Sequence, residues 1–284
     1  MREVFDQAHG LHAYASLAFV TRFIAVPAMV QGGVSHRLLW LLARRFSLQG
    51  EPVCVIDGMA DEAPGQDLLA RLNVSDAAPG ANANVRAAYL VDEAAPGVCI
   101  LPGRQGLLRL ANQAHGAGAQ GAWQRLVAAV PAGSHVLLTA PADLLAVCLQ
   151  GTAARPLVAL DGQPRSVVEA YNAVKVLLQV GDLHPLLVPM ALGGVRSHGH
   201  AQALTQALEA PVQALARCAQ AHLGEDLQIW PVAYDESRDS PADRVPESWW
   251  LKVVDSAIAV PQSPHLAMWG PTTSVDTTLE HRSS

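Results

Sequence analysis

Short and almost continuously apolar runs alternate with amphipathic helical patterns along most of this chain, and this alternation restricts the folds that it can adopt. Such runs are typical of strands that are buried on both faces of a sheet. They cover residues 22–28, 53–57, 86–91, 97–101, 135–139, 157–160, 185–192 and 227–232. Helical patterns lie between them, and the Gly- and Ala-rich residues 112–122 are expected to form a connection. The alternation predicts a doubly wound α/β domain with a mostly parallel sheet.

The composition is that of a packed protein with one large domain or two small ones. Of the 284 residues, 50% are hydrophobic and 15% are charged, which excludes a wholly disordered chain. The formal net charge of −6 argues against a general nucleic-acid binder, because it offers no basic field to a phosphate backbone. The four cysteines are far apart in sequence and are expected to be free thiols in a reducing compartment.

Three segments are expected along the chain. Residues 1–20 carry apolar side chains spaced by three or four, which predicts an amphipathic helix. Residues 21–236 form the α/β domain, and residues 237–284 are a Pro-rich segment with one short helix near 247–259. Trp249 and Trp250 are expected to pack onto the body or onto a second subunit, because membrane-surface helices carry a more basic polar face.

The sequence contains no clean run of about 20 apolar residues, the length that a membrane span requires. Acidic Glu3 and Asp6 stand where a secretory signal has basic residues. The expected location is therefore cytoplasmic, with weak or no membrane contact. A peripheral position at the membrane or at a cell pole is the alternative.

The strand, Gly-Gly turn and helix near residue 32 resemble the opening of the MinD/ParA group of P-loop ATPases. In that group the loop reads KGGxGK(S/T), and the matching residues here are Gln31, Gly32, Gly33, Val34, Ser35, His36 and Arg37. The run at 53–57, which ends in Asp57, resembles the second motif of the group, D-x-D. Residues 166–175 resemble its S-x-x-(D/E)-A-Y-x-x-(I/V)-K helix. The resemblance covers about residues 20–235 and implies a MinD-like fold, although a Gly-Gly turn alone would equally suit another α/β protein.

The N-terminal segment resembles the DQAxxLR motif that precedes the ATPase domain in the FlhG (FleN) family of flagellar regulators. The matching residues are Asp6, Gln7, Ala8, Leu11 and His12, with His12 where the family has Arg. The resemblance implies that this helix docks on FlhF, a GTPase related to the signal-recognition particle, and stimulates its GTP hydrolysis. Gln7 is then the residue that matters most.

The residues that a P-loop needs for catalysis are replaced. A lysine that neutralises phosphate charge and a Ser/Thr hydroxyl that binds Mg²⁺ are required, but His36 and Arg37 stand at these positions. Gln31 replaces a second lysine and Ser35 the last glycine. Asp57 remains, but Met59 replaces the second acid of D-x-D, and Thr139 and Pro189 stand where the group has a Mg²⁺-supporting Asp and an adenine-reading Asn. We therefore expect no catalytic residue, no metal and no cofactor, because phosphoryl transfer depends on positioning and charge neutralisation.

These patterns predict a pseudo-ATPase that regulates flagellar assembly or placement by binding an FlhF-like GTPase, either as a monomer or as a homodimer. A residual anion or ATP site formed by the Gly32 and Gly33 amides is a subsidiary hypothesis. Two other functions stay open: a true ATPase with an atypical site, and an accessory protein of another envelope system such as cellulose secretion.

Overall fold

A computed structural model describes residues 20–29, 33–61, 67–76, 90–91, 97–193, 198–235, 240–241 and 245–261. The predicted N-terminal helix, with Asp6, Gln7, Ala8, Leu11 and His12, lies outside the described residues. So do Gln31 and Gly32 of the predicted loop and the tail beyond residue 261.

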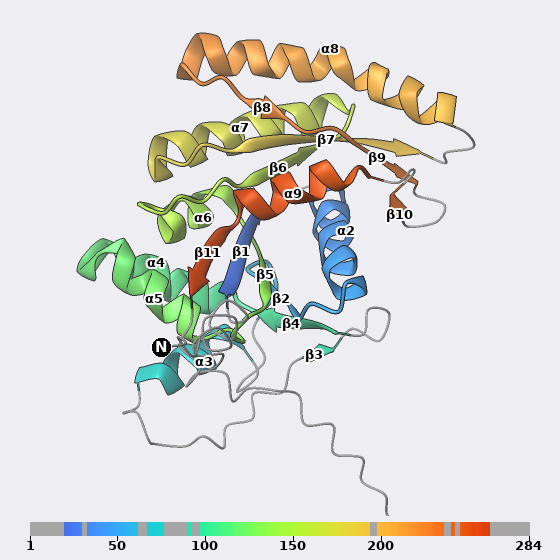
Figure 1. The fold of residues 1–284 in the computed structure, drawn as a ribbon. Coiled ribbons are helices and arrows are strands. Elements are labelled where there is room, and N and C mark those ends of the chain that lie inside the picture. Colours follow the sequence, from blue (N-terminus) through green and yellow to red (C-terminus); the bar gives the residue numbers. More distant parts are fainter. Residues whose placement is uncertain are drawn as a thin grey trace, which may run out of the picture.

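A mostly parallel sheet forms the centre of the first part of the fold (Figure 1). Its strand order is β11-β1-β5-β2-β4-β3. The strands β1 (Val20–Pro27), β5 (His135–Ala140), β2 (Val53–Asp57) and β4 (Val98–Pro102) run parallel, and β3 (Leu90–Val91) is antiparallel to β4. The predicted α/β class with a mostly parallel sheet is therefore confirmed.

A second set of strands continues the architecture beyond β1. The strands β6 (Leu157–Leu160), β7 (Leu186–Gly193) and β9 (Val232–Asp235) are parallel neighbours, β10 (Ser240–Pro241) lies at one edge, and β8 (Gln228–Ile229) pairs with the start of β7. The apolar run at 227–232, predicted as one strand, is thus divided into β8 and β9. Pro231 lies at the break, where a residue without an N–H cannot extend a ladder.

The helices pack on the two faces of the strands and form two apolar cores. On one face lie α2 (Val34–Leu48) and α9 (Glu247–Ser256). The other face is covered by α3 (Leu68–Asp76), α4 (Arg104–Ala117), α5 (Ala119–Ala128), α6 (Ala142–Leu149), α7 (Pro164–Gly181) and α8 (His198–Leu223). Side chains alternate between the cores along each strand, as in β1, where Phe23 belongs to one core and Ile24 to the other.

The Ala-rich residues 112–122 belong to two helices and not to a loop, which corrects the prediction from sequence. Alanine is the strongest helix former, and the helical conformation is interrupted only at Gly118, whose φ is 92°. Gly118 lies between α4 and α5 and accepts this left-handed conformation because it has no Cβ.

The C-terminal segment returns to the centre of the fold. Trp249 and Trp250 are 7% and 6% exposed and contact the core beneath α2, which confirms that they pack onto the body. The helix α9 ends at Ser256, earlier than predicted. Residues 258–261 form β11, which pairs antiparallel with the first half of β1 (Figure 1) and was not predicted from the sequence.

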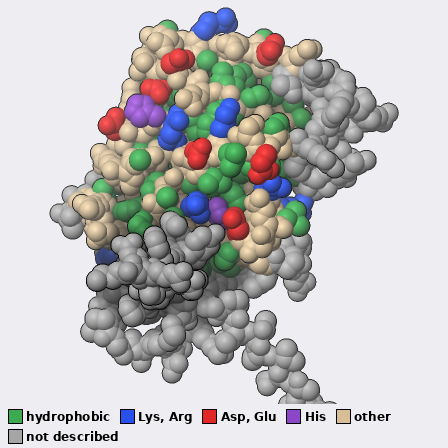
Figure 2. Space-filling model, in the orientation of Figure 1, with side chains coloured by type: hydrophobic (Ala, Val, Ile, Leu, Met, Phe, Trp, Pro, Cys, Tyr) green, Lys and Arg blue, Asp and Glu red, His purple; other side chains and the backbone are tan. Residues whose placement is uncertain are grey.

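Arg45 ties α9 to α2. Its guanidinium lies 2.7 Å from a carboxylate oxygen of Glu247 and 5.3 Å from the ring centre of Trp250. Elsewhere on the surface, the described acidic and basic side chains of the face shown in Figure 2 are interspersed among apolar ones, which gives that face a mixed electrostatic potential.

Candidate functional site

The carboxyl ends of β1, β2 and β5 bring the predicted loop residues to one edge of the sheet. In the parallel register Asp57 lies beside Thr139, and Pro27 lies beside Ala140. The chain leaves β1 at this edge, and α2 begins at Val34 just beyond it. Ligands of open α/β sheets bind at the carboxyl ends of the strands. The fold therefore places Gly33, Val34, Ser35, His36, Arg37 and Asp57 at this edge of the sheet.

The first turn of α2 has no side-chain cap among the described residues. Gly33 occupies the N-cap position, and no acidic residue lies in the first turn. The first N–H groups of a helix have no partner within the helix and carry partial positive charge. Ser35 is buried, with its Oγ lacking a hydrogen-bond partner within the described part of the chain.

His36 is held by its own helix. Its Nε2 accepts a hydrogen bond from the Nε1–H of Trp40, over 2.7 Å. The two rings meet edge to face at 69°, with their centres 5.9 Å apart. The position where a P-loop has a lysine is thus occupied by an imidazole whose Nε2 is engaged within α2.

Arg37 lies against the loop that it follows. Its guanidinium carbon and one η nitrogen are each 3.9 Å from the place that a Cβ on Gly33 would occupy. Guanidinium has five N–H donors and no acceptor, so it cannot bind a metal ion. This side chain adds a positive charge beside the start of α2.

Asp57 stabilises the turn that follows β2. Its Oδ1 accepts the N–H of Met59 at 2.9 Å, and its carbonyl oxygen accepts the N–H of Gly103 at 2.9 Å. Between them, the N–H of Gly58 donates to the carbonyl oxygen of Thr139 at 2.7 Å. Met59, at the position of the second acid, is half exposed. The residual acid thus has a structural role, and the turn is packed directly against β5.

Pro189 lies in the middle of β7, and not at the end of a strand as the comparison with an adenine-reading Asn assumed. It is buried and its register partner is Leu160 of β6. The first residues of β7 pair with β8 and the later ones with β9. Pro189 stands where the partner changes, a place that accommodates a residue without an N–H.

The helix that resembles the S-x-x-(D/E)-A-Y motif is α7, and the positions that match the motif have packing roles here. The Oγ of Ser166 accepts the N–H of Asp161 at 3.0 Å, which closes the connection from β6. Ala170 and Val174 are buried in the core, and Lys175 is exposed. This pattern is that of an amphipathic helix on the sheet.

A buried histidine lies at the opposite, amino-terminal edge of the same sheet. His135 is stacked on Phe46, with ring centres 4.0 Å apart, and its Nε2 lies 2.6 Å from a carboxylate oxygen of Glu51. Its Nδ1 is buried and has no hydrogen-bond partner among the described residues. Burial lowers the pKa of His135 from its ordinary value of 6.5, against the opposing effect of Glu51, and Arg22 lowers it further.

Stability is expected to decrease as the pH falls below about 6.5. In that range the unfolded chain binds a proton at residue 135 that the folded chain, with its lowered pKa, does not bind. The contribution of His135 to the free energy of unfolding is fully present above its pKa in the unfolded chain. It is lost as the pH falls toward its pKa in the folded chain. Urea unfolding between pH 8 and pH 5, compared with His135→Gln, would measure it. An equal pH dependence in both proteins would contradict this assignment.

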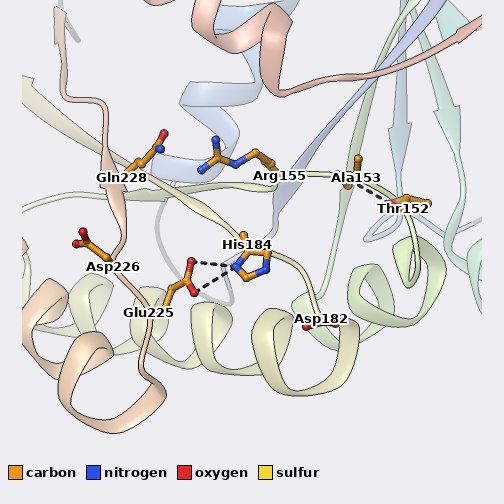
Figure 3. Close-up of a pocket in the computed structure, with 9 residues that line it drawn as sticks. Thr152, Ala153, Arg155, Asp182, His184, Glu225, Asp226 and Gln228 are labelled. Carbon is orange, nitrogen blue, oxygen red and sulfur yellow. Dashed lines mark hydrogen bonds and ion pairs between the residues drawn. The ribbon is translucent and has the colours of Figure 1, made fainter.

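A cavity lies away from the predicted loop, at the amino ends of β6 and β7. It has a volume of about 460 Å³ and is lined by Arg155, Asp182, His184, Glu225 and Asp226, among others. In Figure 3 the His184 and Glu225 side chains point toward each other, with Nδ1 3.0 Å and 3.2 Å from the two carboxylate oxygens. Because it lies at the other edge of the sheet, this cavity is separate from the predicted nucleotide loop.

The residue that the sequence analysis missed is Trp40. A histidine and a tryptophan four residues apart on a helix lie on the same side, so the spacing was a signal that could have been used. In the described part of the chain, no three His, Cys, Asp or Glu side chains are grouped so that they could hold a metal ion. None of the helices described there combines the length and apolar character that crossing a bilayer requires.

Neither a family model nor a curated protein matches this sequence. Three similar solved structures are MinD of the MinC:MinD cell division complex from Aquifex aeolicus, apo McdA from Cyanothece and a ParA family ATPase from Chlorobium tepidum. MinC:MinD is 13% identical over 77% of this chain and 86% of that one, with a TM-score of 0.43. McdA is 13% identical over 83% of this chain and 90% of its own, with a TM-score of 0.46. The ParA family ATPase is 12% identical over 83% of this chain and 90% of its own, with a TM-score of 0.43.

Proposed function

We propose that this protein is a MinD/ParA-like regulator that acts by binding a partner protein and does not hydrolyse ATP. The observation that carries the proposal is the hydrogen bond from Trp40 to Nε2 of His36, which engages within α2 the side chain that stands in place of the lysine. Arg37 offers no oxygen to Mg²⁺, and Asp57 is engaged in a turn. Without the two cationic contributions, the charge that develops on a transferred phosphoryl group is not neutralised.

The proposed partner is an FlhF-like GTPase, and the proposal rests on the resemblance of residues 6–12 to the FlhG motif. An amphipathic helix would place Ala8 and Leu11 in an apolar groove, while Gln7 completes the GTP site of the partner. Asp6 and His12 flank this contact. The body then acts as a monomer, or as a homodimer that needs no nucleotide, in the cytoplasm or peripherally at the membrane or cell pole.

The rival function is that of an atypical ATPase, and one observation favours it. The start of α2 has no side-chain cap and no acid in its first turn, and Arg37 lies beside it with its positive charge. Backbone N–H groups and a nearby guanidinium are suited to bind phosphate. Binding of ATP without hydrolysis would agree with the pseudo-ATPase proposal. Mg²⁺-dependent ATP hydrolysis would instead support the atypical ATPase.

The decisive experiment measures GTP turnover by FlhF with the full-length chain, and with its Gln7→Ala and His9→Ala variants. Gln7→Ala is expected to lose the stimulation, because the side chain that completes the partner site is removed. His9→Ala is expected to retain it, because the motif leaves that position open. Equal stimulation by all three proteins, or none with the unmodified chain, would contradict the proposed partner.

A parallel measurement of ATP hydrolysis with Mg²⁺ separates the two functions of the body. The unmodified chain is expected to release no phosphate above the protein-free rate. Turnover that depends on Mg²⁺ and is lost in His36→Ala would overturn the pseudo-ATPase proposal. The Gln7→Ala protein serves as the control, since it leaves the loop unchanged.

A further inference from the structure

Two cysteines that are far apart in sequence are direct neighbours in the sheet. Cys54 is the second residue of β2, Cys99 is the second residue of β4, and the two are register partners in the parallel ladder. Their side chains lie on the same face, in the core beneath α3 to α6. The two thiols are close enough for Cys99 to affect the titration of Cys54. The thiols are free, as expected, but their pairing in the sheet was not predicted.

The environments of the two thiols differ. Cys54 is fully buried, whereas Cys99 is partly exposed. Interaction with the neighbouring Cys99 and burial raise the pKa of the Cys54 thiol, while Arg71 opposes this effect. Arg71 is buried on α3 and donates a hydrogen bond to the carbonyl oxygen of Ala129. Cys99 is therefore the more exposed residue of the pair, Cys54 is enclosed in the core, and the Arg71 guanidinium is close enough to Cys54 to affect its thiol.

We propose that Cys54 and Cys99 form a peroxide-responsive dithiol that closes to a disulfide within the sheet. Neighbouring strands are about 4.8 Å apart, and disulfides join residues whose Cα atoms are about 4.4–6.8 Å apart. The two residues are register partners, and their side chains lie in the same core. Formation of the disulfide therefore requires rotation of the two side chains and no change in the order of the strands.

The chemistry proceeds in two steps. The thiolate of Cys99 attacks one oxygen of hydrogen peroxide, the O–O bond breaks, and hydroxide leaves, so that Cys99 becomes a sulfenic acid. The sulfur of Cys54 then attacks the sulfur of Cys99, the S–O bond breaks, and the thiol proton of Cys54 leaves with the oxygen as water. Over both steps, two thiols are oxidised, one hydrogen peroxide is reduced, and two waters form.

The other two cysteines are built differently and serve as internal controls. Cys148 is buried on α6, its Sγ donates to the carbonyl oxygen of Leu107 at 3.5 Å, and burial raises the pKa of its thiol to about 12. Its thiolate is therefore scarce at neutral pH. Cys218 is exposed on α8 and has no cysteine beside it in the described part of the chain, so its oxidation leads to links between molecules.

The full-length reduced protein is to be treated with hydrogen peroxide, quenched by acid, alkylated and mapped by peptide mass spectrometry. A peptide pair that links Cys54 to Cys99 is expected in the unmodified chain and in Cys218→Ser. In Cys54→Ser, Cys99 is expected to stop at the sulfenic acid, which a dimedone-type reagent labels. A chain in which Cys99 reaches the sulfinic acid while Cys54 stays reduced, or in which only Cys218 is linked, overturns the proposal.

A second measurement keeps the test valid if a serine variant does not fold. Phenylarsine oxide condenses with two adjacent thiols, forming two As–S bonds and releasing water. The unmodified folded chain is expected to bind one equivalent that maps to Cys54 and Cys99 and that protects them from later alkylation. Alkylation of both residues at the untreated rate would overturn the proposal.

Discussion

Replacement of Gly58 by alanine is expected to lower the free energy of unfolding by about 3 kcal/mol, because it overpacks a closed turn. A Cβ at this position would lie 2.6 Å from Cβ of Ala140, 2.8 Å from Cδ1 of Leu107 and 2.9 Å from the carbonyl oxygen of Thr139. Two of these atoms belong to β5 close to its backbone and cannot move without shifting the strand. The φ angle of Gly58 is not in the left-handed region, so the missing space alone causes the effect.

The matched control is Gly121→Ala on α5. A Cβ there meets nothing within 4 Å, and this glycine has a helical conformation that alanine prefers. A gain of about 0.5–1 kcal/mol is expected, because alanine restricts the unfolded chain and favours the helix. Urea unfolding followed by circular dichroism measures both variants. If Gly58→Ala is as stable as the unmodified chain, the close contact of the turn after Asp57 with β5 is wrong.

Trp250→Ala is expected to cost about 3–5 kcal/mol of stability, because it removes a large buried side chain from beneath α2. The Trp250 ring contacts Trp249 edge to face, with centres 4.8 Å apart, and lies 5.3 Å from Cζ of Arg45. Loss of this anchor also weakens the connection of α9 to β11 and so the pairing of β11 with β1. Limited proteolysis of the C-terminal segment is therefore expected to become faster.

Leu251→Ala is the matched control, because it shortens an exposed side chain of the same helix and shows whether the loss of stability is specific to the buried Trp250. Leu251 is 58% exposed, and its replacement is expected to change stability by no more than about 0.5 kcal/mol. The two variants are to be compared by thermal unfolding and by the rate of cleavage near residue 261. Equal losses in both would mean that the tryptophan is not held between α9 and α2 as the structure describes.

Much of the fold could be predicted because strand burial and helix periodicity are properties of short segments. The runs at 53–57 and 135–139 became β2 and β5, and the helical pattern after Gly33 became α2. The failures have local physical causes. Gly- and Ala-rich residues 112–122 were misread because alanine favours helix even where glycine suggests a loop. The run at 227–232 was broken by Pro231, which lacks the N–H that a strand needs.

For the candidate site, the sequence predicts which functional groups are present but not which hydrogen bonds they make. That Arg37 has no oxygen for Mg²⁺ follows from the side chain, whatever the fold. That Nε2 of His36 is engaged depends on which group Trp40 donates to, and that Asp57 stabilises a turn depends on where the chain goes after β2. Pro189 was misplaced because the sequence does not show where β7 changes its partner from β8 to β9.

The sequence by itself determined the α/β alternation and the identity of the side chains at the start of α2, because both are properties of residues taken singly or over one turn or strand. Only the tertiary structure decided that Cys54 lies against Cys99, that Gly58 has no room for a methyl group, and that residues 258–261 pair with β1. These features depend on which distant segments become neighbours. Local patterns cannot specify this, because many pairings of apolar strands bury the same surface.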